Sequence, residues 1–179
     1  MGCGCKKKVN TGSMFENGPL DSSNPADWGP CIWFSLHCLT EKIGKSGNAI
    51  IDADQGITMK FLIQNLQNIL PCQVCQGHAR AYVESHSLDF LNILKGEALQ
   101  TNLRDWLFTF HNAVRTRTQS TLDFTTTDQV KSHYEKCTLD KEFTNNLSRY
   151  VTFAVQQGWV KLDNWKRWVV QFNRLKLLI

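Results

Sequence analysis

The chain has 179 residues, 42% of them hydrophobic and 20% charged, which is typical of a folded globular protein and excludes a disordered or membrane-embedded one. Its net charge of +4 is too small to indicate nucleic-acid binding. No apolar run approaches the roughly 20 residues of a membrane-spanning helix. The polar stretch after Lys6–Lys8 does not fit a secretory signal peptide.

Apolar residues recur at helical spacing along most of the chain, and the period-two alternation of strands is almost absent. The sequence therefore predicts an all-α fold. Pro30 fits the first turn of the first helix, Pro71 ends the second, Gly96 lies in a linker, and Asp128 caps a short fifth helix. The predicted helices cover residues 30–44, 57–70, 73–85, 103–116, 128–137, 141–157 and 162–175.

We expect three parts: a flexible N-terminal tail over 1–24, a helical domain over 25–137 and a C-terminal helical extension over 138–179. Residues 159–179 carry five basic residues against Asp163 alone. Such a basic amphipathic helix can lie on a membrane or bind an acidic partner. The favoured interpretation is that its apolar face, which includes Trp165, packs on its own domain or on a dimer partner.

Seven cysteines, an odd number, argue against a secreted disulfide scaffold. Cys31 and Cys38 are two helical turns apart, about 10 Å, which is beyond disulfide reach. With Cys137 they are predicted to be buried thiols, although a link from Cys137 to another cysteine stays open.

Cys72 and Cys75 form a Cys-x-x-Cys pair that follows Pro71 and opens a predicted helix. A helix N-terminus stabilises a thiolate, and two cysteines in one first turn can close a disulfide, so a redox site is favoured. The alternative is a zinc site that includes His78, for which His111, His133 and Cys137 are the candidate further ligands. Inert packing is the third interpretation.

Three motifs occur in order along residues 27–118. Together they resemble the FAD-linked sulfhydryl oxidases of the Erv/ALR family, most of all the short form found in large DNA viruses. The motifs are Trp28-Gly29-Pro30-x-x-Trp33-x-x-Leu36-His37, Pro71-Cys72-x-x-Cys75-x-x-His78 and Trp106-x-x-x-x-His111-Asn112-x-Val114.

The resemblance implies an up-down four-helix bundle with a short fifth helix, which binds FAD and forms a homodimer. It implies oxidation of thiol-containing protein substrates by molecular oxygen, giving disulfides and hydrogen peroxide. Cys75 would be the flavin-proximal catalytic cysteine and Cys72 the partner that exchanges with substrate thiols. No metal or nucleic acid is expected. The implied cofactor-binding residues are Trp33, His37, His78, Tyr82, His111, Asn112 and Val114.

The chain departs from the family pattern after Val114. Arg115 stands where asparagine is usual, and Ser120-Thr121 replaces a Lys-Pro pair whose lysine is expected near the phosphates. Arg115 and Arg117 either supply that positive charge or are solvated helix-end residues. Phe108 and Thr125 occupy both positions of a structural disulfide found in many members, so that bond is absent as a whole.

The N-terminal Gly2-Cys3-Gly4-Cys5 segment admits three interpretations. Cys3 and Cys5 could carry electrons from substrates to the active site, as shuttle cysteines do in this family. Acylation of Gly2 and a cysteine, beside Lys6–Lys8, could attach the protein to a membrane, although Lys6 replaces the usual Ser or Thr. A plain tail is the third. Host cytoplasm or virion is the expected location for a viral enzyme.

The sequence leaves two alternatives to an oxidase open. One is a zinc-binding helical interaction module that uses Cys72, Cys75 and His78. The other is a lipid-anchored helical adaptor in which the cysteine pair is incidental. A visible absorption spectrum separates them, because only a flavoprotein is yellow.

Overall fold

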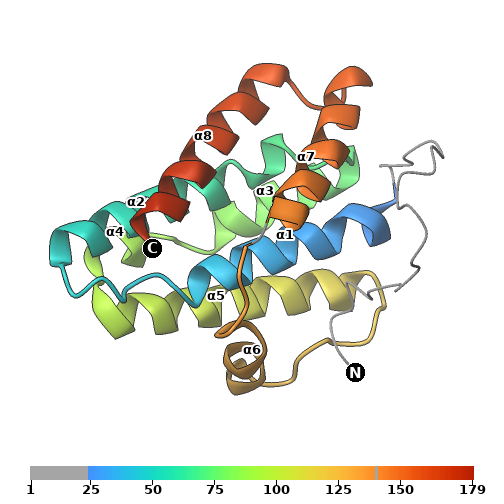
Figure 1. Cartoon of the computed structure of the whole chain (residues 1–179). Coiled ribbons are helices and arrows are strands. Elements are labelled where there is room, and N and C mark those ends of the chain that lie inside the picture. Colours follow the sequence, from blue (N-terminus) through green and yellow to red (C-terminus); the bar gives the residue numbers. More distant parts are fainter. Residues whose placement is uncertain (1–23, 140) are drawn as a thin grey trace, which may run out of the picture.

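The computed structural model describes residues 24–139 and 141–179, and these residues are helical without strands (Figure 1). The all-α prediction is confirmed. The elements are α1 (Pro25–Thr40), α2 (Ala49–Gln64), the 3₁₀ helix η1 (Leu66–Asn68), α3 (Gln73–Ser85), α4 (Phe90–Ile93), α5 (Gly96–Arg117), α6 (Thr127–Tyr134), α7 (Lys141–Gln156) and α8 (Leu162–Leu178).

The helices α1, α2, α3 and α5 form the bundle. One side of α1 packs against α5, and another packs against α7 (Figure 1). The short α6 crosses beneath α5 and also contacts α1, while α8 lies along α2. No helix in the described ranges is both long enough and apolar enough to cross a membrane.

The C-terminal helices pack on the bundle, which confirms the favoured interpretation of their apolar faces. Trp168, Phe172 and Leu175 of α8 are at most 2% exposed and belong to one hydrophobic cluster with residues of α1, α2 and α5. The indole nitrogen of Trp168 donates to the backbone oxygen of Leu62 in α2, at 3.1 Å. The proposed boundary at residue 138 stays a prediction, although the core continues across it.

The first helix begins five residues earlier than predicted. Asn24 is its N-cap, and its side-chain oxygen accepts from the backbone nitrogen of Ala26 at 3.0 Å. Pro25 is the first helical residue, and its missing backbone N–H costs nothing at a position where that group has no partner within the helix. Pro30 therefore lies inside α1, not at its start. The sequence holds two proline signals, and the earlier one, preceded by a capping asparagine, marks the true start.

The predicted second helix over 57–70 is wrong at both ends. Asn48 caps α2, and its side chain accepts from the backbone nitrogen of Ile50 at 2.9 Å. The helix ends at Gln64, where the side chain of Asn65 bonds back to the oxygen of Phe61 and a 3₁₀ turn follows. Its first two turns bury polar residues, so an apolar period did not reveal them.

Gly96 begins α5, seven residues before the predicted start at Leu103. Its backbone nitrogen donates to the buried carboxylate of Asp52 in α2 at 2.8 Å. Gly44 has a φ of +74° and packs so closely on Gly96 that a Cβ at Gly44 would collide with the Gly96 backbone. These contacts join distant segments, which is why local sequence did not place the start.

The short helix α6 is capped by Thr126, whose hydroxyl accepts from the backbone nitrogen of Gln129 at 3.3 Å, and not by Asp128. It ends at Tyr134 instead of residue 137. A second hydrophobic cluster forms around it from Phe124, Val130 and Tyr134. Phe108 packs on that cluster, so apolar contact occupies the place of the missing family disulfide.

The remaining cysteines agree in part with the prediction. Cys31 and Cys38 are buried, whereas Cys137 is half-buried. The sulfur of Cys38 donates to the backbone oxygen of Cys137 at 3.3 Å, and these two cysteines are not joined by a disulfide. The predicted tail with Cys3 and Cys5 lies outside the described residues.

A buried ion pair joins the end of α1 to α5. The guanidinium of Arg104 donates twice to Glu41, at 2.6 Å and 2.7 Å, and also bonds to Gln100. The side chains of Glu41 and Arg104 are 1% and 8% exposed. The hydrogen bond to Glu41 raises the pKa of Arg104, although burial alone would lower it. The pair fixes the register of the two helices that carry most of the candidate site.

Candidate active site

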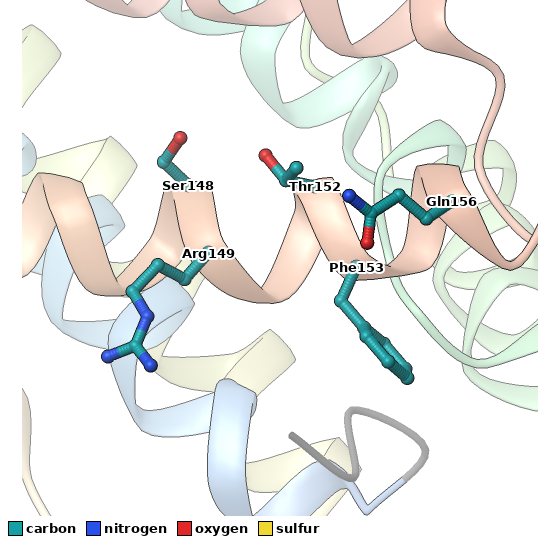
Figure 2. A pocket seen from close by; sticks show the side chains of 5 residues that line it. All are labelled: Ser148, Arg149, Thr152, Phe153 and Gln156. Carbon is teal, nitrogen blue, oxygen red and sulfur yellow. The ribbon is translucent and has the colours of Figure 1, made fainter. Parts of the chain in front are cut away.

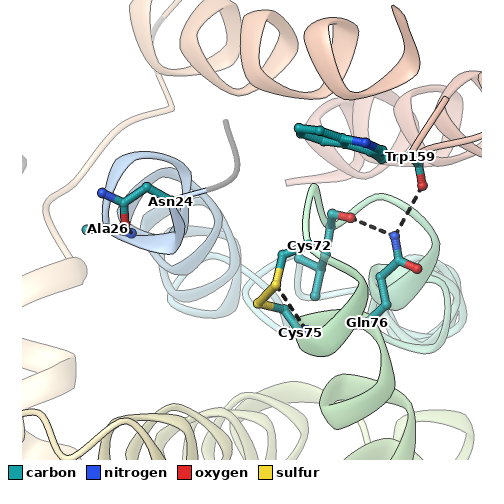
Figure 3. The surroundings of a disulfide bond; sticks show 7 residues. Asn24, Ala26, Cys72, Cys75, Gln76 and Trp159 are labelled. Carbon is teal, nitrogen blue, oxygen red and sulfur yellow. Dashed lines mark hydrogen bonds between the residues drawn. A yellow bond between two sulfur atoms is a disulfide. The ribbon is translucent and has the colours of Figure 1, made fainter. Parts of the chain in front are cut away.

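Cys72 and Cys75 form a disulfide at the start of α3 (Figure 3). Cys72 is the N-cap of the helix, and its sulfur accepts from the backbone nitrogen of Cys75 at 3.2 Å. The Cα atoms are 5.2 Å apart, within the usual range for a disulfide. Both residues are half-buried and pack against the core. Helix 73–85 was thus predicted correctly, and the two cysteines at its start are close enough to form a disulfide.

The turn between α7 and α8 lies beside this disulfide (Figure 3). The side-chain nitrogen of Gln76 donates to the backbone oxygens of Leu70 (2.8 Å) and Trp159 (3.3 Å). Trp159 is 37% exposed, and Val74, between the two cysteines, is 67% exposed. The disulfide therefore opens onto a surface with two large apolar side chains.

A chain of aromatic rings runs from α1 across α5 to α3. Trp33 stacks on His111, with ring centroids 4.2 Å apart and planes 11° apart, and meets the edge of Phe110. Phe110 in turn stacks on Tyr82 of α3 at 4.4 Å. Tyr82 follows Cys75 by seven residues and so lies on the same face of α3. The rings thus approach the helix face that begins with the disulfide.

The two predicted histidines meet inside the bundle. His37 Nε2 lies 3.2 Å from His111 Nδ1, and His111 Nε2 lies 3.4 Å from a carboxylate oxygen of Asp123. His37 is fully buried and stacks on Tyr134, with ring centroids 4.9 Å apart. Its other nitrogen, Nδ1, has no hydrogen-bond partner among the described residues.

Both imidazoles are neutral near pH 7. Burial, together with the nearby His111 and His133, lowers the pKa of His37 to about 3. Burial also lowers the pKa of His111 to about 4, with Asp123 acting in the opposite direction. Their contact is therefore a hydrogen bond between neutral rings, in which one nitrogen donates and the other accepts.

The loop after α5 is fastened to that helix by two predicted site residues. The Arg115 guanidinium pairs with the Asp123 carboxylate at 2.8 Å and donates to the backbone oxygen of Thr121 at 3.0 Å. The amide of Asn112 donates to the backbone oxygen of Phe124 at 3.3 Å. Arg115 is therefore paired, with 30% of its side chain exposed, and its role near phosphates stays a prediction.

The other predicted residues are less closely tied to the rings. Val114 is half-buried against the core, and Arg117 is exposed at the end of α5. His78 is half-buried on α3, without a hydrogen bond or ring contact to the described residues. The structure thus brings Trp33, His37, Tyr82 and His111 together, and we call these residues and the rings that contact them the ring cluster. Val114, Arg117 and His78 do not belong to it.

Sequence reasoning missed several members of the ring cluster. Phe110 was not singled out, and Trp106, which meets the edges of Phe110 and Tyr82, was noted only within a motif. Phe110 directly precedes His111 in the sequence, and that position could have indicated it. Asp123 and Tyr134 follow the motif region, and nothing in the local sequence points to them.

The geometry gives the zinc interpretation no support. The sulfurs of Cys72 and Cys75 are bonded to each other, which leaves no thiolate for a metal. Within the described ranges no group of three or more His, Cys, Asp or Glu side chains could hold a metal ion.

A hollow of about 280 Å³ lies along α7 (Figure 2). None of the predicted site residues lines it. Its lining residues are Ser148, Arg149, Thr152, Phe153 and Gln156.

Fold and site together define an all-helical protein in which a Cys-x-x-Cys disulfide opens a helix beside a cluster of aromatic rings. The chain belongs to the Erv1/Alr family, because the model of that family matches residues 30–135. This match runs from α1 to α6 and leaves out α7 and α8.

The chain is also similar to a curated viral protein, "Putative FAD-linked sulfhydryl oxidase 096R" of Invertebrate iridescent virus 3. The two are 31% identical over 96 residues, which are 54% of this chain and 59% of that protein. The match therefore spans little more than half of the viral relative. No solved structure matches the chain.

Proposed function

We propose that this protein is an FAD-dependent thiol oxidase, which forms disulfides in protein substrates and passes the electrons to oxygen. The observation that carries the proposal is the Cys72–Cys75 disulfide at the start of α3, half-buried beside an apolar surface. Membership of the Erv1/Alr family and the name of the viral relative support it.

The first step is thiol–disulfide exchange. A substrate thiolate attacks one sulfur of the Cys72–Cys75 bond and forms a mixed disulfide, which a second substrate thiol resolves. The substrate loses two electrons and two protons and gains one S–S bond, while Cys72 and Cys75 become thiols. The helix N-terminus stabilises the sulfur that leaves as a thiolate. In our proposal Cys72 exchanges with substrate and Cys75 faces the cofactor.

The residues present fit a flavin nucleotide. Trp33, Tyr82 and His111 are flat rings of the kind that stack on a flavin or adenine, and in this structure they stack on one another and on neighbouring rings. His37 Nδ1 is a buried polar atom that lacks a partner among the described residues. FAD, when bound, accepts two electrons from the dithiol and passes them to oxygen, giving hydrogen peroxide. The protein's part is to bind the cofactor, hold Cys75 toward it and exclude water. Asn112, Val114, Arg115, Arg117 and His78 complete the proposed cofactor set.

The visible absorption spectrum of the purified protein tests the proposal. We expect a flavin band that bleaches with dithiothreitol in the absence of oxygen and returns in air. Cys75→Ser should keep the colour and lose thiol-dependent oxygen uptake. Cys137→Ser, in a half-buried cysteine outside the disulfide, is the matched control and should keep both. A colourless protein that holds one zinc ion would instead establish the zinc-binding module.

The proposal also covers the substrates, the assembly and the N-terminal cysteines. Thiol-containing proteins and oxygen are the proposed substrates, and a homodimer is the proposed assembly. Cys3 and Cys5, outside the described residues, are proposed as shuttle cysteines, with N-terminal acylation as the alternative. Mass spectrometry of the protein from infected or expressing cells separates the two, because acylation adds a fixed mass to Gly2 or a cysteine. Localisation in host cytoplasm or virion stays a prediction.

A further inference from the structure

One polar atom at the heart of the ring cluster is buried without a partner in the described part of the chain. His37 is fully buried, and its Nδ1 makes no hydrogen bond. Its opposite nitrogen, Nε2, lies 3.2 Å from His111 Nδ1. A buried polar atom without a partner is costly, so a native protein has a reason to keep one.

The position of the protons follows from the groups at the other end of this chain of contacts. A neutral imidazole has one N–H and one acceptor nitrogen. The carboxylate of Asp123, 3.4 Å from His111 Nε2, favours the proton on that nitrogen. His111 Nδ1 is then an acceptor, His37 Nε2 carries the donating proton, and His37 Nδ1 is left with a lone pair.

Asp123 is itself held in place. One of its carboxylate oxygens pairs with Arg115 at 2.8 Å, and the other faces His111. Arg115 also bonds to the backbone of Thr121, and Asn112 bonds to the backbone of Phe124, on either side of Asp123. The loop therefore presents its carboxylate to His111 in one orientation.

We propose that Asp123, held by Arg115, is a positioning residue that sets the tautomers of His111 and His37, so that His37 Nδ1 accepts a hydrogen bond from an N–H or O–H group of bound FAD. The identity of the ligand, FAD, rests on the proposed function, whereas the assignment of the two tautomers does not. Burial keeps both imidazoles neutral, and a neutral imidazole has two tautomers between which a neighbouring carboxylate can select.

Nitrogen-15 NMR of the cofactor-free protein tests the first half directly. Long-range ¹H–¹⁵N spectra distinguish a protonated ring nitrogen from an acceptor one. We expect both His37 and His111 to carry the proton on Nε2. A wild-type His111 with its proton on Nδ1 overturns the proposal without the need for any variant.

Asp123→Asn removes the carboxylate at nearly constant volume. The tautomers of both rings should then become mixed or reversed, and FAD affinity, followed by flavin fluorescence, should fall on the order of fivefold to tenfold, as for one lost hydrogen bond. Asp128→Asn, in an exposed aspartate of α6, is the matched control and should change neither. Unchanged tautomers in a folded Asp123→Asn protein overturn the proposal.

Adding FAD to the wild-type protein tests the second half. The Nδ1 resonance of His37 should move upfield, as an acceptor nitrogen does on receiving a hydrogen bond. Bound FAD with an unmoved His37 resonance contradicts this inference alone and leaves the oxidase intact. A protein that binds no FAD contradicts the proposed function and removes the ligand of His37, while the tautomer spectra still decide the role of Asp123.

Discussion

Gln76 joins α3, the helix that begins at the Cys72–Cys75 disulfide, to Trp159 in the turn between α7 and α8. Its side-chain nitrogen donates to the tryptophan's backbone oxygen at 3.3 Å. That turn lies beyond the part of the chain matched by the family model. The C-terminal helices thus contribute one edge of the surface onto which the disulfide opens.

This tie predicts how the C-terminal turn affects turnover. Gln76→Ala loses the hydrogen bonds to Leu70 and Trp159, so the turn is held less firmly beside Cys72. We expect kcat/KM for a protein thiol to fall severalfold and turnover of dithiothreitol to change little, because a small thiol needs no docking surface. Oxygen uptake with both substrates measures the difference.

Gln73→Ala is the control for that experiment. Gln73 lies in the same first turn of α3, but its side chain is exposed and makes no hydrogen bond to the described residues of the turn before α8. It should leave both activities unchanged. An equal loss with both substrates in the Gln76 variant would show that the bond serves the disulfide itself and not the docking of proteins.

The buried Glu41–Arg104 pair predicts a large and asymmetric effect on stability. Glu41→Gln leaves a buried guanidinium without its charged partner, which should lower the free energy of unfolding by about 3–5 kcal/mol. Replacing both residues by apolar ones of similar volume should restore much of that loss. Urea denaturation followed by circular dichroism measures both.

The exposed Lys60–Asp89 pair provides the comparison. The Asp89 side chain is 76% exposed, and water screens its interaction with Lys60. Asp89→Asn should leave the unfolding midpoint within experimental scatter. A Glu41→Gln protein as stable as this control would mean that the pair between α1 and α5 contributes nothing.

The two buried histidines predict loss of stability in mild acid. Their pKa values are about 3 and 4 in the folded protein, against 6.5 for an ordinary histidine. The unfolded chain therefore binds more protons below pH 6.5, so acidification favours unfolding. Between pH 7 and pH 5 the free energy of unfolding should fall by about 2 kcal/mol for each imidazole.

Urea titrations at several pH values measure this slope. His37→Gln should remove about half of it, whereas His86→Gln, in an exposed histidine, should leave it unchanged. A slope that survives the loss of His37 would mean that other groups cause the acid sensitivity.

The thiols outside the disulfide should differ in reactivity. Burial raises the pKa of Cys38 to about 11, and Cys38 is fully buried, whereas Cys137 is half-buried. Since the thiolate is the reactive form, iodoacetamide should label Cys137 well before Cys38 in the native protein. Peptide mass spectrometry follows the two sites, and labelling at equal rates would contradict the native burial of Cys38.

Local signals predicted the elements whose boundaries depend on neighbouring residues. Pro71 and the Cys72–Cys75 pair placed α3 correctly, because a proline stop and a helix N-terminus act within a few residues. The start of α5 was missed because it depends on Asp52, 44 residues away, which accepts the Gly96 N–H. Tertiary hydrogen bonds of this kind leave no local pattern.

The candidate site was likewise predictable where its residues lie in local motifs and not where tertiary contacts place them. Trp33, His37 and His111 lie in motifs at helical spacing, and the structure brings them together. Asp123 lies in a loop whose path depends on Arg115 and Asn112. Its place beside His111 is a property of that path, which spacing along the chain does not describe.

The sulfur of Cys72 accepts the N–H of Cys75 while it is also half of the disulfide. The covalent ring spans only four residues, so opening it frees little chain entropy, and a cysteine sulfur can still cap the helix after reduction. Oxidised and reduced proteins can therefore share one architecture. Under the proposed function, electrons would enter and leave at a fixed point, and the remaining helices would keep their places from one turnover to the next.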